Sequence, residues 1–232
     1  MSFNGKYFII QRYQMIVTNN SIYLNTPRTG GTWIETVLAP ITVAAANGEF
    51  PSQDLVQTHK NVFVFVRNPW SWYASVYNSN IAGTGQSMQH LFTALGYTPT
   101  FDDFVRAMEN PGPMYKRKLL ALCNADGASD TSCEMTFIHD WMVGSKSLYQ
   151  TVCDRYYTIA TRLGRIENII VELKNMTIVA EEQNAVVDTN IDCTVKTNIG
   201  TPVNYHDMYT PELVDIVANS SKDLISRLNY RF

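Results

Sequence analysis

The residues best suited to chemistry lie in a short turn near the start of the chain, residues 27–33 (PRTGGTW). The turn follows a β-prone run, Ser21–Leu24, and opens a segment with helical spacing, Thr32–Leu38. Its two glycines let backbone N–H groups approach an anion, and a helix N-terminus offers unpaired N–H groups and the positive end of its dipole. Arg28 adds a full positive charge, and the threonines add hydroxyl donors. The turn predicts a cradle for a phosphate or sulfate group, although an ordinary strand-to-helix turn capped by Thr32 has the same sequence features.

A second candidate anion-binding group follows Asn61–Val66 (NVFVFV). This β-branched and aromatic run is typical of a strand that is buried on both faces. Arg67 lies at its carboxyl end, and Ser75 lies about two turns into the helix that we expect next. Ligands of open α/β sheets bind beyond the carboxyl ends of the strands, where a guanidinium can contact two phosphate oxygens at once. Arg67 alone could be an ordinary surface arginine, but with the glycine turn it predicts a second phosphate contact.

The rest of the chain alternates between strand-like and helix-like segments. We expect helices at Trp70–Tyr77, Phe101–Met108, Arg165–Leu173 and Thr210–Leu228, and a further strand at Tyr156–Ala160. Thr210 and Pro211 form a typical helix start, with an N-cap hydroxyl followed by a proline. This alternation predicts a single α/β domain over residues 1–232, with a central, mainly parallel sheet flanked by helices.

Composition and charge narrow the classes of function. The chain has 232 residues, 45% of them hydrophobic, which excludes a disordered protein. Its net charge of −3 argues against a protein that coats nucleic acid through its overall charge. Any anion-binding site must therefore come from a local cluster of positive groups. No apolar stretch approaches the ~20 residues of a membrane span, and no signal peptide is evident. We expect a cytoplasmic protein with reduced cysteines; a Cys123–Cys133 disulfide is the alternative for an exported one.

The two candidate segments together resemble motifs of the sulfotransferase family. PRTGGTW resembles the loop that binds the 5′-phosphosulfate, and residues 66–77 (VRNPWSWYASVY) resemble the 3′-phosphate motif, including the interval from Arg67 to Ser75. Residues 162–168 (RLGRIEN), the segment Lys196–Gly200 and residues 205–232 resemble parts of the Golgi-type and bacterial carbohydrate sulfotransferases. The resemblance thus extends in patches over most of the chain.

This resemblance implies a P-loop-like, three-layer fold and a specific donor. The donor would be 3′-phosphoadenosine 5′-phosphosulfate (PAPS), the product adenosine 3′,5′-bisphosphate (PAP), and no metal would be needed. The acceptor would be a hydroxyl or an amine. Because the chain resembles the carbohydrate branch of the family, that group would belong to a carbohydrate. The phosphosulfate would be bound by Arg28, Thr29, Gly30, Gly31, Thr32 and Trp33, and the 3′-phosphate by Arg67 and Ser75, with Lys196 in a segment that closes over the donor. The family usually has Lys where this chain has Arg28, which puts the rate of transfer in question rather than donor binding.

Two residues between the motifs are candidates for the general base. His59 resembles the Thr-His dyad of family members that use histidine, and an imidazole is well suited to proton abstraction at neutral pH. Glu49 lies roughly where glucosaminyl sulfotransferases have a catalytic glutamate. The plain alternatives are an exposed histidine at the start of a strand and a loop carboxylate.

Two other functions remain open on the sequence. The first is a homologue that binds PAPS or PAP but transfers slowly or not at all, as Arg28 and the unassigned base suggest. The second is a small-molecule kinase of the P-loop type, which shares the strand–loop–helix architecture. The GxxxxGK[ST] phosphate loop is absent, and this absence weakens the kinase interpretation.

Overall fold

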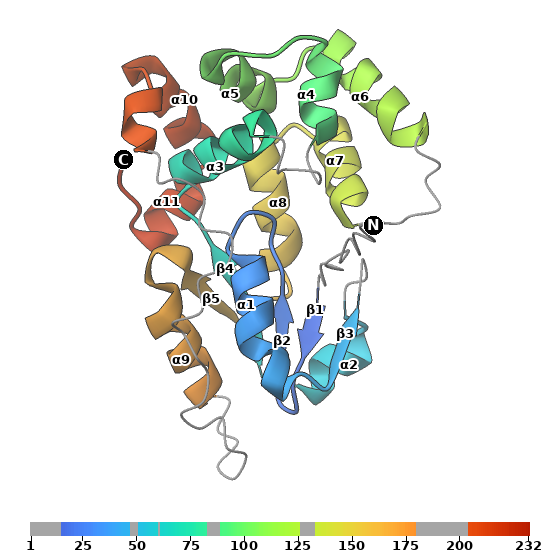
Figure 1. The fold of residues 1–232 in the computed structure, drawn as a ribbon, viewed down its shortest axis with the longest axis vertical. Helices are drawn as coiled ribbons and strands as arrows, with labels where there is room; N and C mark the ends of the chain where they lie inside the picture. The colour runs from blue at the N-terminus through green and yellow to red at the C-terminus, as the bar shows by residue number, and fades with distance from the viewer. Residues whose placement is uncertain (1–14, 47–50, 60, 83–88, 126–132, 180–203) are drawn as a thin grey trace, which may run out of the picture.

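The computed structural model describes residues 15–46, 51–59, 61–82, 89–125, 133–179 and 204–232 (Figure 1). The strands are β1 (Met15–Val17), β2 (Ser21–Leu24), β3 (Ala44–Ala46), β4 (Asn61–Val66) and β5 (Arg162–Arg165). The α-helices are α1 (Gly31–Leu38), α2 (Gln53–Thr58), α3 (Pro69–Ile81), α4 (Gln89–Leu95), α5 (Phe101–Glu109), α6 (Pro113–Ala125), α7 (Cys133–Val143), α8 (Leu148–Tyr157), α9 (Ile169–Val179), α10 (Pro211–Ser220) and α11 (Lys222–Leu228). Short 3₁₀ turns are η1 (Ala39–Ile41), η3 (Ile166–Asn168) and η4 (Tyr205–Met208).

The strands form one mixed sheet in the order β3-β1-β2-β4-β5. β2, β4 and β5 run parallel to one another, whereas β1 is antiparallel to both β2 and β3. The α/β class and the parallel centre of the sheet are therefore confirmed, while the β1–β3 side is antiparallel. Because β2 and β4 are parallel neighbours, the segments after Leu24 and Val66 leave the sheet at the same edge.

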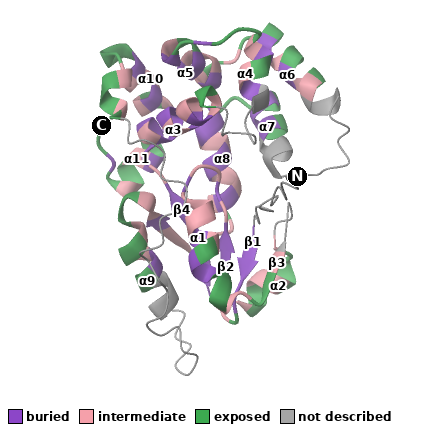
Figure 2. Ribbon diagram, in the orientation of Figure 1, coloured by how far each residue is buried: buried purple, intermediate pink, exposed green. Residues whose placement is uncertain are grey.

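Side chains on the two faces of the sheet belong to two hydrophobic cores. On one face Val62, Val64 and Val66 pack with residues of α3, α5, α7, α8 and α10, among them Trp72, Phe104, Trp141, Tyr149 and Leu213; we call this the main core. On the other face Phe63 and Phe65 pack with residues of α1 and α9, which form the second core. All six residues of β4 are buried, which confirms the expected doubly buried strand (Figure 2).

The helices expected at Trp70–Tyr77 and Phe101–Met108 are found, as α3 and α5. The helix expected at Arg165–Leu173 begins only at Ile169, because Arg165 ends β5 and Ile166–Asn168 form η3. Two further expectations are corrected. Tyr156–Ala160 is not a strand: Tyr156 and Tyr157 end α8, and the strand comes later, at Arg162–Arg165. Tyr156 and Tyr157 lie on this helix, and Tyr156 is buried in the main core. The long C-terminal helix is divided at Ser221 into α10 and α11. The N-cap at Thr210 is confirmed, because its side chain accepts the Leu213 N–H.

Among the described residues, none of the helices has the length and apolar character to cross a membrane.

Candidate anion site at the β2–α1 and β4–α3 turns

The glycine loop (residues 27–31) connects β2 to α1 through two residues in the left-handed backbone region. These are Arg28, with φ 65°, and Gly30, with φ 81°. Gly30 is the N-cap of α1, and its carbonyl accepts the N–H groups of Trp33 and Ile34. Within the described part of the chain, the N–H groups of Gly30, Gly31 and Thr32 have no hydrogen-bond partner. The loop therefore ends in adjacent backbone donors at the positive end of a helix.

Gly31 leaves room for the side chain of Asn25. A Cβ at Gly31 would lie 2.0 Å from the Asn25 Oδ1 and 2.4 Å from its Nδ2. Asn25 Oδ1 accepts a hydrogen bond from the buried Tyr23 hydroxyl (3.3 Å), and its Nδ2 donates to Glu35 Oε1 on α1 (2.9 Å). Asn25 thus joins β2 to α1 beneath the loop, and glycine is the residue that this close approach requires.

Two further hydrogen bonds fix the loop from the inside. Thr29 Oγ1 donates to the Thr26 carbonyl (2.7 Å), and Trp72 Nε1 on α3 donates to the Pro27 carbonyl (2.9 Å). Thr29 is only 1% exposed, so its hydroxyl supports the loop instead of facing a ligand, contrary to the sequence prediction. The Thr32 cap is also not formed, because Gly30 is the N-cap and no side chain caps it.

The side chains expected at the two phosphate positions meet at this edge of the sheet. Arg28 Nη2 donates to the hydroxyl of Ser75 on α3 (3.1 Å) and to its carbonyl (3.3 Å). Arg67 Nη1 donates to the Arg28 carbonyl (3.2 Å), and Arg67 Nε donates to Ser71 Oγ (2.6 Å). Two guanidinium groups therefore lie beside the glycine loop. Ser71 was missed by the sequence analysis, although it lies four residues after Arg67, a spacing at which helical side chains meet.

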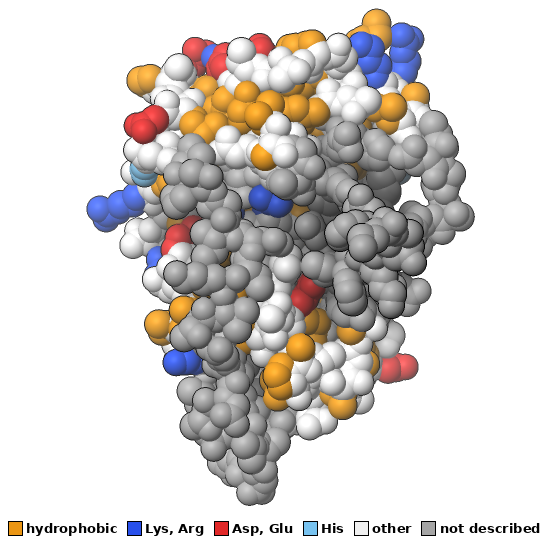
Figure 3. All heavy atoms as spheres, in the orientation of Figure 1, with side chains coloured by type: hydrophobic (Ala, Val, Ile, Leu, Met, Phe, Trp, Pro, Cys, Tyr) orange, Lys and Arg blue, Asp and Glu red, His pale blue; other side chains and the backbone are white. Residues whose placement is uncertain are grey.

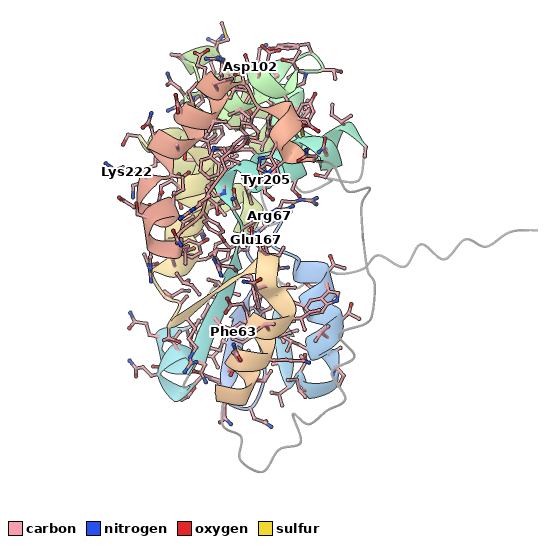
Figure 4. The ribbon with its side chains drawn as sticks, turned by 90° about the vertical axis from the view of Figure 1, so that its left-hand side faces the viewer. Phe63, Arg67, Asp102, Glu167, Tyr205 and Lys222 are labelled. Atoms are coloured by element: carbon pink, nitrogen blue, oxygen red, sulfur yellow. The ribbon has the colours of Figure 1, made fainter. Side chains whose placement is uncertain are left out.

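Arg67 lies in a largely buried setting with one carboxylate nearby. Burial lowers the pKa of Arg67 below its usual value, and the charge of Glu167 acts in the opposite direction. The Tyr149 hydroxyl donates to the Arg67 carbonyl, and this contact anchors the end of β4 to α8. In Figure 4, Arg67 lies between Tyr205 and Glu167, at the level where the helices above meet the sheet below.

His59 lies at the opposite edge of the sheet. It follows α2 and precedes the amino end of β4, and its Nδ1 is within 2.8 Å of the Leu55 carbonyl. The six residues of β4 separate it from Arg67, about 20 Å of strand at the usual rise per residue. The structure therefore does not bring His59 to the glycine loop, and its expected role as a base there is corrected. Glu49 and Lys196 lie outside the described residues.

The basic groups near the loop are a local feature. On the face drawn in Figure 3, the Lys and Arg side chains of the described residues are scattered and do not form a continuous basic band. Groups of three or more potential metal ligands are likewise not found among the residues that the structure describes.

Comparisons with protein-family models, with curated proteins and with solved structures found no match for this chain.

Proposed function

We propose that this chain is a sulfotransferase that binds PAPS and moves its sulfuryl group to an acceptor hydroxyl or amine, in line with the motifs that it resembles. The single observation that carries the proposal is the meeting of Arg28, Arg67 and Ser75 beside the glycine loop. Two segments far apart in sequence, the glycine loop and the β4–α3 segment, supply these donors at one edge of the sheet.

The charges of this site match a donor with two anionic ends. The N–H groups at the start of α1 and the Arg28 guanidinium would bind the 5′-phosphosulfate. Arg67 and Ser75 would bind the 3′-phosphate. For Ser75 this requires that its hydroxyl exchange the Arg28 contact for a phosphate oxygen, a rearrangement of one partly buried side chain.

Sulfuryl transfer resembles phosphoryl transfer, in which in-line displacement is promoted by positioning and electrostatics. Arg28 would stabilise the charge that develops on the leaving oxygen. As an arginine it would act by charge and hydrogen bonding, since it does not give up a proton near neutral pH. Glu49 stays a candidate base, and a carbohydrate acceptor stays a prediction from the resemblance alone.

A second candidate is a homologue that binds PAPS or PAP with little or no turnover. Two observations favour it. The Arg28 guanidinium is held by Ser75, and His59, the better-placed base on sequence grounds, lies at the far edge of the sheet. Both candidates predict the same donor site and differ only in catalysis.

Ligand-induced thermal stabilisation tests the donor site. PAP should raise the melting temperature in the presence of EDTA, whereas ATP with magnesium should not. Arg67→Gln should weaken PAP binding at least tenfold, because a charge-assisted contact to phosphate is lost. Arg227→Gln, on the exposed end of α11, is the matched control and should bind as the parent does. Stabilisation by ATP–magnesium but not by PAP would overturn the proposal in favour of a kinase.

Transfer of labelled sulfate separates the two candidates that share the donor site. The protein is incubated with labelled PAPS and a panel of glycans, lipids and phenols. Transfer to a glycan supports the sulfotransferase with its expected acceptor class. PAP binding without transfer to any class of acceptor supports the inactive homologue.

A further inference from the structure

Glu167 is a carboxylate placed next to the arginine that we assign to the 3′-phosphate. It lies in η3, between β5 and α9. Its Oε1 accepts the backbone N–H of Asn68 (2.8 Å), the residue after Arg67, and its Oε2 accepts the Tyr230 hydroxyl (3.3 Å). In Figure 4, Glu167 lies just below Arg67, toward the sheet. A carboxylate beside an anion-binding site repels the anion and weakens its binding.

The charge of Glu167 reaches Arg67 without a direct ion pair. In the described part of the chain no nitrogen of Arg67 lies within 4 Å of a Glu167 oxygen. The carboxylate nevertheless opposes the effect of burial on Arg67 by favouring its charged form. The guanidinium is oriented by Ser71 and by the Arg28 carbonyl, so Glu167 acts on it through space.

These contacts give Glu167 two effects on a bound 3′-phosphate. By holding the Asn68 N–H it fixes the turn from which Arg67 projects. By its charge it offsets part of the attraction between Arg67 and a phosphate. A doubly charged phosphate at Arg67 would therefore bind less tightly than it would if Glu167 carried no charge.

We propose that Glu167 is a positioning residue that holds Arg67 in place and limits the affinity of the site for the 3′-phosphate, so that PAP is released after transfer. This inference rests on the proposed function, and it assigns to Glu167 a role in product release. Enzymes whose product resembles the donor gain turnover when the product is not bound too tightly.

The test compares binding of PAP and of adenosine 5′-phosphate to Glu167→Gln by calorimetry. Glutamine can still accept the Asn68 N–H and contact Tyr230, but it has no charge. We expect about fivefold tighter PAP binding, a modest factor because Glu167 is exposed to solvent. The affinity for adenosine 5′-phosphate should change less than twofold, because that ligand has no 3′-phosphate. A change confined to the 3′-phosphorylated ligand is not expected from a merely structural role.

Two control variants separate charge from structure. Glu172→Gln makes the same change in net charge one turn farther along, on α9, and should leave PAP affinity unchanged. Tyr230→Phe removes the hydrogen bond to Glu167 but keeps its charge, and it should not tighten PAP binding. Weaker or unchanged PAP binding in Glu167→Gln, or an equal change for both ligands, overturns the inference.

The affinities of the parent protein for PAP and for adenosine 5′-phosphate show whether the inference about Glu167 fails alone or the proposed function fails with it. If the parent does not prefer PAP to adenosine 5′-phosphate, the donor site itself is wrong and the inference falls with it. If the parent prefers PAP and Glu167→Gln does not increase that preference, the donor site stands and only the role of Glu167 is overturned.

Discussion

Gly31 is the residue of the loop that tolerates substitution least. A Cβ there would overlap the Asn25 side chain, which cannot move without losing its hydrogen bonds to Tyr23 and Glu35. We expect Gly31→Ala to lower the free energy of unfolding by about 2–4 kcal/mol, from overpacking together with lost hydrogen bonds. PAP binding should be lost as well, because the N–H groups of the loop would be displaced. Urea unfolding and calorimetry measure the two effects.

Gly112 provides the matched control for this prediction. A Cβ at Gly112 meets no atom within 4 Å, so Gly112→Ala should leave both stability and PAP binding as in the parent. Asn25→Ala combined with Gly31→Ala removes the overlap and should regain part of the lost stability. If Gly31→Ala alone is as stable as the parent, Asn25 does not hold the loop as described.

Single residues also show where inference from the sequence ends. The glycines and Arg67 were assigned from their residue types and from their positions directly after predicted strands. Both features can be read from the local sequence. The hydroxyl of Thr29 could not be assigned in the same way, because the path of the loop decides whether it points inward. His59 is close to Arg67 in sequence, but a strand lies between them and carries them to opposite edges.

At the scale of elements, the carboxyl group of Glu109 on α5 is buried where this helix packs against α10 and α3. Its Oε1 is buried and has no hydrogen-bond partner among the described residues. Burial raises the pKa of Glu109 to about 7, and the nearby hydroxyls of Ser220 and Tyr73 reduce the effect. The native protein therefore binds a proton that the unfolded chain releases at lower pH.

The sign of the resulting pH dependence follows from this raised pKa. The contribution of protonated Glu109 is fully present below the unfolded pKa of 4.5 and is lost as the pH rises through about 7. Glu109→Gln stays neutral, so we expect it to be more stable than the parent at pH 8, by up to ~3 kcal/mol, and similar to it near pH 4.5. Urea unfolding at several pH values measures this difference.

Glu212→Gln is the control for Glu109→Gln. Glu212 lies on the exposed side of α10, where it pairs with Arg106, so its replacement should not flatten the stability profile between pH 5 and pH 8. If Glu109→Gln follows the same profile as the parent throughout this range, the carboxyl is not protonated in the native protein at neutral pH.

Elements were predicted well where one pattern dominated the segment. The apolar run of β4 and the capped start of α10 gave correct assignments, because burial on both faces and an N-cap are local signals. The strand expected at Tyr156–Ala160 was wrong, because aromatic residues also suit a helix face that packs in the main core. Tertiary burial decided between the two, and a short segment does not contain that information.

At the scale of the whole molecule, the two cores share the sheet. β4 contributes Val62, Val64 and Val66 to the main core and Phe63 and Phe65 to the second. Phe63 is 1% exposed and packs against Tyr23, with ring centroids 5.4 Å apart. The antiparallel pairing of β1 and the division between the cores follow from contacts distant in sequence, so composition and periodicity predicted the class of the fold but not this arrangement.

A substitution in the second core therefore tests whether the described fold unfolds as one unit. Phe63→Ala should lower the free energy of unfolding by about 3–5 kcal/mol, through lost burial and the cavity that forms. Since Trp70, Trp72 and Trp141 lie in the main core, tryptophan fluorescence reports chiefly on the opposite face of the sheet. We expect the urea transitions followed by fluorescence and by far-UV circular dichroism to move together to lower urea.

Val143→Ala, at a side chain that is 69% exposed, is the control and should leave both transitions in place. A fluorescence midpoint that stays at its parent value in Phe63→Ala, while the dichroism midpoint falls, would show that the two faces of the sheet unfold separately. The glycine loop and α3 would then belong to units of independent stability, because α1 packs in the second core and α3 in the main one. Contacts between Arg28 and Ser75 would in that case depend on docking of the two units, and PAP would stabilise the protein mainly by holding them together.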